Sequence, residues 1–261
     1  MKLSTILLSS AFIFAASGAY ATEVTHPFYV PGQGEVMSDT TYAFTSIDGD
    51  DAGELTLNTL SEKVSVGVYK DLAVYVTGSN TWMRVNPDYD SSWDEDRNLA
   101  WNVGATYNLV NNGKTFVQVD ANYGQKENWA TVGEYKAVNV ALKGGYDFGW
   151  AMPYAKVTGE FPVAQSKQSL NDPVYSAYVG AYRLFADKIA VDAGVNYGWV
   201  KNDDVKGWAV VARADYLFTD KISVGVFGSY IFDGQVDDNK YLELDTDYDG
   251  YTVGLNLKAA F

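Results

Sequence analysis

The chain of 261 residues contains no cysteine and a single histidine, and both scarcities narrow what it can do. Without cysteine, neither disulfides nor thiol chemistry can contribute. A hydrolase site needs its imidazole held among strand or loop residues, and a zinc site needs a cluster of His and Cys ligands. The one histidine, His26, lies in a segment rich in proline and glycine, and we interpret it as a surface residue of a flexible lead-in. We therefore expect no enzyme, no catalytic residue, no cofactor and no metal, although a site built from carboxylates alone stays open.

Basic residues are also scarce, because 19 Lys and Arg stand against 33 Asp and Glu. This acidity argues against nucleic acid as a partner. The acidic residues gather in runs at 48–51, 88–96, 203–204 and 237–249, between the segments that we predict as strands. We interpret them as solvated loop edges; the alternative is bridging by divalent ions to lipopolysaccharide phosphates. An EF-hand is not expected, because Asn256 stands where a loop starting at Asp245 would need its bidentate Glu.

Long apolar runs are missing after the first residues. Lys2, the apolar run 6–16 and the small-residue site Ala19-Tyr20-Ala21 predict a secretory signal peptide over residues 1–21. The run is too short for a transmembrane anchor and is not followed by a charged stop. No later run approaches the roughly 18 residues of a spanning helix. A chain of this kind can enter a membrane only as a closed barrel, because lipid cannot satisfy an open sheet edge.

What the sequence has in abundance is alternation with a period of two residues. After a periplasmic lead-in over residues 22–34, alternating segments continue to residue 261 without a helical period, which predicts one β-barrel domain over 35–261. The predicted strands are Glu35–Ile47, Glu54–Tyr69, Leu72–Arg84, Asn98–Leu109, Thr115–Gln125, Ala137–Phe148, Ala151–Val163, Val174–Leu184, Ile189–Trp199, Lys206–Leu217, Ile222–Phe232 and Tyr251–Phe261. This count predicts an all-β, antiparallel up-and-down barrel of about twelve strands. The first two strands are the least regular, and losing both would leave ten.

The predicted connections alternate between tight turns and longer polar loops. Twelve antiparallel strands need this pattern when both termini share the periplasmic side. Aromatic residues lie beside the tight turns (Tyr69, Phe148, Trp150, Phe185, Phe218 and Phe261) and toward the loops (Trp82, Trp101, Trp199, Trp208, Tyr230 and Phe232). We interpret these sets as the two interfacial girdles of a membrane barrel, with ordinary strand propensity as the alternative.

The last eleven residues form the clearest predicted strand and carry a family resemblance. Thr252, Gly254, Leu257 and Ala259 follow the pattern polar-x-Gly-x-x-apolar-x-apolar, and Phe261 closes the chain. In this the chain resembles bacterial outer-membrane β-barrel proteins. The resemblance implies that Gly254, Leu257 and Phe261 belong to a signal read by the barrel-assembly machinery. It also implies a place in the outer membrane of a Gram-negative bacterium, among its lipid and lipopolysaccharide, with both termini in the periplasm.

A soluble barrel or sandwich alternates as well, but it hides its apolar face inside. The second face of the predicted strands carries Gly, Asn, Ser, Ala and paired charges, whereas a soluble surface usually carries more Lys and Glu. This composition favours a polar lumen and an apolar side toward lipid. Among twelve-stranded families, acidic-sugar porins are similar in length, but their lumens are dense in arginine and only Arg183 and Arg213 are candidates here. Autotransporter translocators need a passenger and a pore-filling helix, and the segment 22–34 is too short for either.

Pairing the predicted strands symmetrically about their connections places a row of charges on the lumen face. The pairing sets Lys143 opposite Lys156, Asp192 opposite Arg213, and Glu160 opposite an asparagine. The predicted lumen set is Asp120, Lys143, Lys156, Glu160, Arg183, Asp192 and Arg213. Because like charges that face each other are destabilising unless screened, the two lysines favour a wet lumen. The alternative is an interior closed by salt-bridged side chains. Barrels of eight strands are filled and those of sixteen are open, and twelve lies between.

The leading hypothesis is a porin-like, narrow passive channel for small hydrophilic solutes, in which the lumen bases set ion preference. The alternative is a non-conducting structural or surface-interaction barrel whose acidic loops bind a ligand or lipopolysaccharide.

Deleting Phe261 is expected to impair insertion into the outer membrane more than it lowers the stability of barrels that have already folded, because the residue would act as a signal. Heat-modifiable migration of the protein in outer-membrane fractions measures insertion, and urea unfolding of purified barrels measures stability. Phe261→Tyr, which keeps a terminal aromatic ring, is the control. Normal insertion of the shortened chain would contradict the signal.

Overall fold

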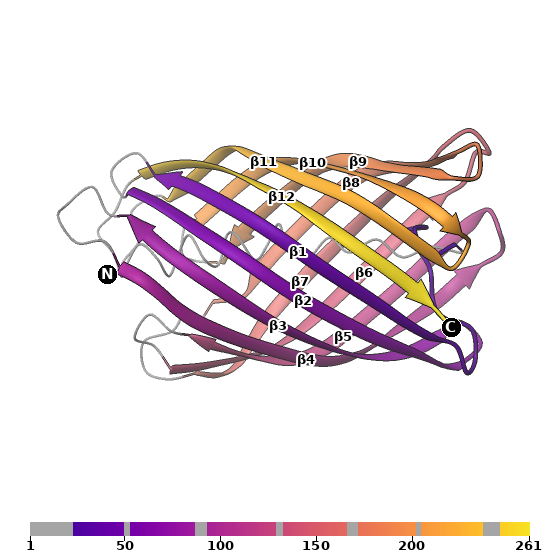
Figure 1. The fold of residues 1–261 in the computed structure, drawn as a ribbon, viewed down its shortest axis with the longest axis horizontal. Helices are drawn as coiled ribbons and strands as arrows, with labels where there is room; N and C mark the ends of the chain where they lie inside the picture. Colours follow the sequence, from indigo (N-terminus) through magenta and orange to yellow (C-terminus); the bar gives the residue numbers. More distant parts are fainter. Residues whose placement is uncertain are drawn as a thin grey trace.

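The structure, a computed structural model, describes residues 23–49, 53–86, 93–128, 133–165, 172–201, 205–236 and 246–261. These residues form twelve antiparallel strands in a closed barrel, in which each strand pairs with its sequence neighbours and β1 also pairs with β12 (Figure 1). The strands are β1 Val36–Gly49, β2 Gly53–Tyr69, β3 Leu72–Asn86, β4 Trp93–Asn111, β5 Thr115–Asn128, β6 Gly133–Tyr146, β7 Met152–Gln165, β8 Val174–Phe185, β9 Ile189–Val200, β10 Val205–Thr219, β11 Ile222–Val236 and β12 Thr246–Ala260. All predicted strands are present. Both β1 and β2 belong to the wall, so the ten-stranded alternative is wrong.

Alternation along each strand decides which side chains face inward. On β12, the odd-numbered Val253 and Leu255 are exposed on the outer face. The even-numbered Asn256 and Lys258 are buried inside the barrel. The closing pair β1–β12 runs without a register shift from Met37–Ala260 to Gly49–Tyr248. The polar face of the alternation is therefore the interior, as expected. Within the described residues, no helix has the length and hydropathy needed to cross a membrane.

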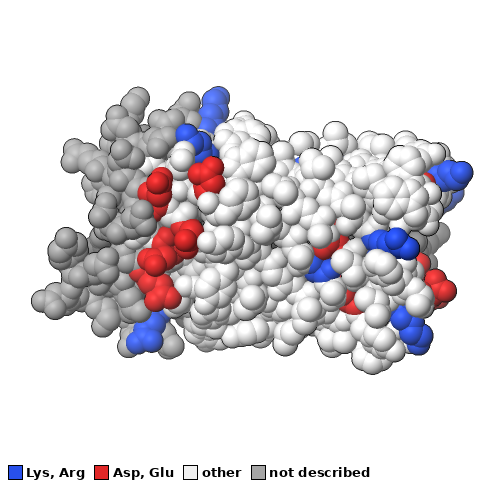
Figure 2. Space-filling view, turned by 90° about the horizontal axis from the view of Figure 1, so that it is seen from above, with Lys and Arg blue, Asp and Glu red and all other residues white. Residues whose placement is uncertain are grey.

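Tight turns lie together at one end of the barrel, which we call the turn end, and we call the opposite end of the barrel the loop end (Figure 1). Positive φ angles at Asp71, Gly113, Gly149, Ala186 and Asp187 let the chain reverse within a few residues. The aromatic residues predicted beside these turns are all exposed. Most of the face seen in Figure 2 is free of charged residues between the two ends. The signal peptide and the acidic positions 50–51, 88–90, 203–204 and 237–245 lie outside the described residues.

Polar side chains on the outer face concentrate on β1 and β2. Ser38 donates a hydrogen bond of 2.6 Å to Glu62, Thr40 donates to the same carboxylate, and the Tyr42 hydroxyl donates to Asn58 at 2.7 Å. These residues share the side of exposed Leu60 in the β1–β2 register. Because the outward positions are partly polar, the alternation of polarity is weak in these two strands. This explains why they are the least regular in the sequence.

The lead-in is folded inside the turn end, and the prediction of a flexible surface segment with an exposed His26 is wrong. Val24, Phe28 and His26 are buried. The chain folds back on itself, since His26 N–H donates to the Glu23 carbonyl at 2.9 Å and Tyr29 N–H to the His26 carbonyl at 3.1 Å. We call residues 23–31 the N-terminal plug. The hydrophobic effect explains this buried position. The apolar residues of the segment pack against apolar wall residues that come together only after strands distant in sequence have paired.

The interior is apolar at both ends. At the turn end, Phe28 of the plug packs with Phe116, Met152, Tyr154 and other residues of the wall. At the loop end a separate cluster of inward residues is buried: Ile47, Leu55, Leu57, Val200, Val205, Ala209, Ile231, Val236 and Tyr248. Between the two clusters most inward side chains are polar or charged, with Phe227 opposite Gly254 as an apolar exception. The candidate site therefore lies in the middle of the barrel.

The plug leaves the barrel by crossing β2 at Gly67. Gly34 N–H donates to the Gly67 carbonyl at 2.8 Å, and Gly67 N–H donates to the Glu35 carbonyl at 3.0 Å. A Cβ added at Gly67 would lie 2.0 Å from the Gly32 carbonyl oxygen and 2.4 Å from that of Pro31. Only glycine permits this approach of two backbones.

Gly67→Ala is therefore expected to displace the lead-in while leaving the barrel closed, because the methyl group meets backbone oxygens that cannot move aside alone. Amide hydrogen exchange of residues 24–29 should accelerate at least about tenfold, a loss of about 1.4 kcal/mol of protection. Gly78→Ala is the matched control, because nothing lies within 4 Å of a Cβ at Gly78. Equal exchange in the two variants would show that the crossing does not hold the plug.

Candidate functional site

The candidate site is a belt of charged side chains that face the middle of the barrel interior. We call it the charged belt and define it by these residues: Asp39, Lys63, Asp120, Lys126, Lys143, Lys156, Glu160, Asp192, Arg213, Asp215 and Lys258. They come from β1, β2, β5, β6, β7, β9, β10 and β12. Each lies on the inward parity of its strand, so strand alternation alone brings the belt together.

Asp120 is held by two hydroxyl groups. The Tyr75 hydroxyl donates to its Oδ1 at 2.7 Å and Thr106 Oγ1 donates to its Oδ2 at 2.5 Å. The Lys63 ammonium lies 3.7 Å from the centroid of the Tyr75 ring. Both carboxylate oxygens are therefore engaged, with one lysine placed directly over the tyrosine that holds them.

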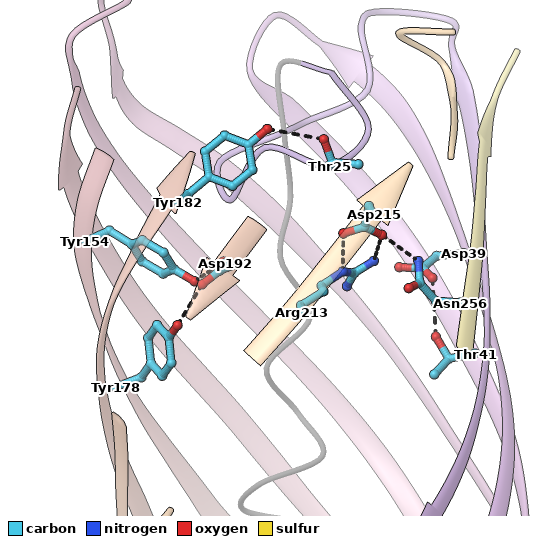
Figure 3. A network of polar contacts seen from close by, with 10 residues as sticks. All are labelled: Thr25, Asp39, Thr41, Tyr154, Tyr178, Tyr182, Asp192, Arg213, Asp215 and Asn256. Atoms are coloured by element: carbon cyan, nitrogen blue, oxygen red, sulfur yellow. Dashed lines mark hydrogen bonds and ion pairs between the residues drawn. The ribbon is translucent and has the colours of Figure 1, made fainter. Parts of the chain in front are cut away.

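Asp192 is held in the same way by two tyrosines, Tyr154 at 2.6 Å and Tyr178 at 2.7 Å (Figure 3). Arg213 lies directly opposite Asp192 in the β9–β10 register, as predicted. Its guanidinium, however, forms a bidentate pair with Asp215, with Nε to Oδ2 at 2.6 Å and Nη2 to Oδ1 at 2.8 Å. A bidentate pair is among the stronger ionic contacts of proteins. Arg213 is thus neutralised from its own strand rather than across the sheet.

Glu160 lies opposite Asn139, also as predicted. The Lys126 ammonium contacts both of its carboxylate oxygens at 3.1 Å, and the Tyr135 hydroxyl donates to it at 2.8 Å. Lys126 and Glu160 therefore form an ion pair in the part of the belt that lies toward the loop end.

Lys143 is where the charged belt meets the plug. It lies opposite Lys156 in the β6–β7 register, which confirms the predicted pairing of two like charges. Its side chain is buried, and its ammonium donates to the backbone carbonyl of Pro27. The same ammonium lies 5.0 Å from the centroid of the Phe28 ring. The plug therefore covers one lysine of the pair.

Several further contacts fix the plug against the wall. The Phe28 ring stacks on Phe116 with centroids 5.2 Å apart, and Asn108 Nδ2 donates to the Phe28 carbonyl at 3.1 Å. The hydroxyls of Thr25 and Tyr182 lie 3.3 Å apart (Figure 3). The plug thus closes the turn end by contacts with β4, β5, β6 and β8.

Arg183 does not belong to the interior, and its predicted place in the lumen is wrong. It is exposed on the outer face and its guanidinium lies 4.6 Å from the Phe185 ring. The β8–β9 register pairs Arg183 with Val191 and places Tyr182 opposite Asp192. The prediction was displaced by one residue at the tight turn, and a one-residue displacement moves a side chain to the other face of the sheet.

The predicted set did not include Asp39, Lys63, Lys126, Asp215 and Lys258, or the tyrosines that hold the carboxylates. Lys63 shares an inward parity with Ser65 on β2, so the alternation could have indicated it. The outward polar residues of β1 and β2 obscured that signal. No sequence signal indicated the tyrosines, because an aromatic residue in a strand is equally compatible with an outward position. Among the described residues, no group of three or more His, Cys, Asp or Glu is placed to hold a metal ion.

Comparisons with known proteins identify the fold. No family model matches the chain, and no curated protein matches it. Its structure is similar to an outer-membrane channel from Pseudomonas putida F1, with a TM-score of 0.70 and 11% identity over 90% of this chain and 98% of that one. It is also similar to the translocator domain of the autotransporter NalP from Neisseria meningitidis, with a TM-score of 0.60 and 10% identity over 97% of this chain and 96% of that one. The β-domain of the Bordetella autotransporter BrkA has a TM-score of 0.58 and 12% identity over 88% of this chain and all of that one (100%).

These neighbours are outer-membrane β-barrels, and the chain has their fold. The likeness extends over nearly the whole described barrel but not to the residues of the charged belt, because identities of 10–12% show the fold alone. The predicted all-β barrel is confirmed.

Plug docking is expected to depend on pH through His26. The pKa of His26 falls from 6.5 to about 4, mainly because the imidazole is buried. The positive charge of Lys143 on β6 contributes to this fall, Asp147 opposes it, and the Tyr182 ring of β8 packs against the imidazole. Since the docked plug favours neutral imidazole, docking is strongest above pH 6.5 and weakens as the pH falls toward 4. Over about 2.5 pH units at about 1.4 kcal/mol each, docking loses about 3.5 kcal/mol.

Hydrogen exchange of residues 24–29, corrected for the intrinsic pH dependence of exchange, should show this loss between pH 7 and pH 4.5. His26→Gln, which cannot be protonated, should lose no protection at the lower pH, since burial raises the pKa of Glu23 in the plug and its protonation favours docking. A wild-type plug whose protection does not change with pH would contradict the assignment.

Proposed function

We propose that this protein is a narrow passive channel of the outer membrane for small hydrophilic solutes, closed at its turn end by the N-terminal plug in the present arrangement. The observation that carries the proposal is the charged belt. Buried charges are expensive even when paired, and apolar side chains of similar volume are often neutral or stabilising in their place. The two apolar clusters at the ends show that this chain can fill barrel interior with apolar residues. A charged middle therefore supports a path for polar solutes rather than a filling.

Selectivity in this proposal comes from the width of the lumen and from the field of its bases. Lys143 and Lys156 face each other, and Lys63 and Lys258 join them on the inward faces of β2 and β12. Arg213 contributes less, because Asp215 neutralises it. Arg183 is removed from the selectivity set by its place on the outer face.

The placement in the outer membrane follows the same reasoning. The exposed apolar strand faces and the aromatic residues beside the tight turns suit contact with lipid. Val36 and Phe261 exchange backbone hydrogen bonds of 3.0 and 2.8 Å at the turn end, so the last residue completes the wall there. We propose that this end is periplasmic, that the loop end contacts lipopolysaccharide, that the barrel-assembly machinery reads Gly254, Leu257 and Phe261, and that the protein is not an enzyme.

A non-conducting barrel is the second candidate, and a specific observation favours it. The plug closes the turn end, the inward cluster of Ile47 and its neighbours narrows the loop end, and ion pairs such as Lys126–Glu160 fill part of the belt. Such an interior would serve a structural or surface-binding barrel equally well.

Planar-bilayer recordings are expected to show single-channel steps that become larger or more frequent when residues 23–31 are deleted. In the deleted protein, Lys143→Gln together with Lys156→Gln should lower the ratio of anion to cation permeability several-fold. Arg183→Gln, which removes one positive charge on the outer face, is the control for each lysine replaced singly, and it should leave the ratio unchanged because it lies outside the lumen. If neither the whole protein nor the deleted one conducts, the non-conducting barrel is correct.

A further inference from the structure

Three lysines converge on one carboxylate at the junction of the belt and the plug. Lys143 and Lys156 are directly opposite each other, and Asp120 lies opposite Ala141, two residues before Lys143 on the same face. Lys63 lies over Tyr75, which donates to Asp120. The charge of Asp120 acts on all three lysines. We call Lys63, Lys143, Lys156 and Asp120 the lysine cluster.

The lysine cluster carries more positive than negative charge. Its one carboxylate already accepts hydroxyl hydrogen bonds on both oxygens, from Tyr75 and Thr106. The next carboxylate on this side, Asp192, is engaged by Tyr154 and Tyr178. Within the lysine cluster itself, three ammonium groups stand against one carboxylate, which favours anions there, and like charges that face each other are less destabilising when an anion screens them.

The plug supplies the cluster with a neutral oxygen rather than an anionic one. Lys143 donates to the Pro27 carbonyl, and the Phe28 ring lies beside the ammonium. A hydrogen bond from an ammonium to an anionic oxygen is stronger than one to a neutral carbonyl, because both partners are then charged. The Pro27 carbonyl thus occupies a position that an anionic oxygen would hold more tightly.

We propose that the lysine cluster is a binding site for a small oxyanion, such as a solute carboxylate or phosphate group, and that its occupancy releases the N-terminal plug by competing with Pro27 for Lys143. The inference rests on the proposed function in one respect, namely that the plug closes a channel. Release is selective, because a neutral solute gains nothing at the cluster. It is reversible, because Phe28–Phe116 stacking and the Asn108 hydrogen bond favour redocking.

The test titrates the complete mature protein in detergent micelles with inorganic phosphate at constant ionic strength, set with sodium chloride. Hydrogen exchange of residues 24–30 reports plug docking. Phosphate is expected to accelerate this exchange with saturation, and glycerol at equal concentration is expected to leave it unchanged. A plug that stays equally protected at all phosphate concentrations would overturn the proposal.

Variants at the two cluster lysines other than Lys143, which binds Pro27, sharpen the test. Lys156→Gln and Lys63→Gln should each raise the half-maximal phosphate concentration at least about tenfold, which corresponds to about 1.4 kcal/mol. Lys114→Gln, an exposed change of the same charge at the turn end, should leave it unchanged. A shift equal to that of Lys114→Gln would mean that phosphate acts through general charge, and the cluster would not be the site. Heat-modifiable migration verifies that each variant is folded.

Conductance of the protein lacking residues 23–31 separates this inference from the proposed function. If that protein conducts but phosphate does not release the plug of the complete chain, the inference fails and the channel stands. If phosphate releases the plug but the deleted protein does not conduct, the anion site stands and the channel fails.

Discussion

The structure depends on closure of its sheet. A bilayer offers no hydrogen-bond partner to an open strand edge, so the first and last strands must pair. They do so along nearly their whole length, from Met37–Ala260 to Gly49–Tyr248, and the final residue pairs with Val36 at the rim. Once the barrel is closed, every strand has one face outside and one inside. The apolar residues go to the outer face, and the polar residues are left to an interior that must accommodate them.

The side chains of the interior are arranged in layers along the barrel. At the two ends, apolar side chains pack against one another, and at the turn end the chain supplies its own lead-in to complete the packing. In the middle, carboxylates are held by tyrosine hydroxyls or by a bidentate arginine, as at Asp192 and Asp215. Lys143 donates to a backbone carbonyl of the plug. The closure of one end and the charge of the middle are therefore linked through a single side chain.

Assuming hairpins symmetric about their turns predicted several cross-strand pairs correctly, and the one wrong placement, Arg183, came from a slip of one residue. Lys143–Lys156, Asn139–Glu160 and Asp192–Arg213 all lie opposite each other as expected. At the β8–β9 turn, Phe185 pairs with Ile189 and Arg183 with Val191, symmetrically about Asp187, and the prediction that placed Arg183 near Asp192 departed from this symmetry by one residue. That difference is enough to move Arg183 from the interior to the outer face, because side chains alternate with a period of two.

The sequence by itself determined the strands, their number, the two faces and most of the cross-strand pairs, because all of these depend on alternation and on short turns, which are local. Tertiary structure alone decided the position of His26 and the rest of the plug, since the apolar site that receives them is built from β5, β7 and β8, far away along the chain. It also decided which charges neutralise one another. Tyr75 on β3 and its hydrogen-bond partner Asp120 on β5 are separated by β4, and the curvature of the closed wall brings their side chains within reach of each other.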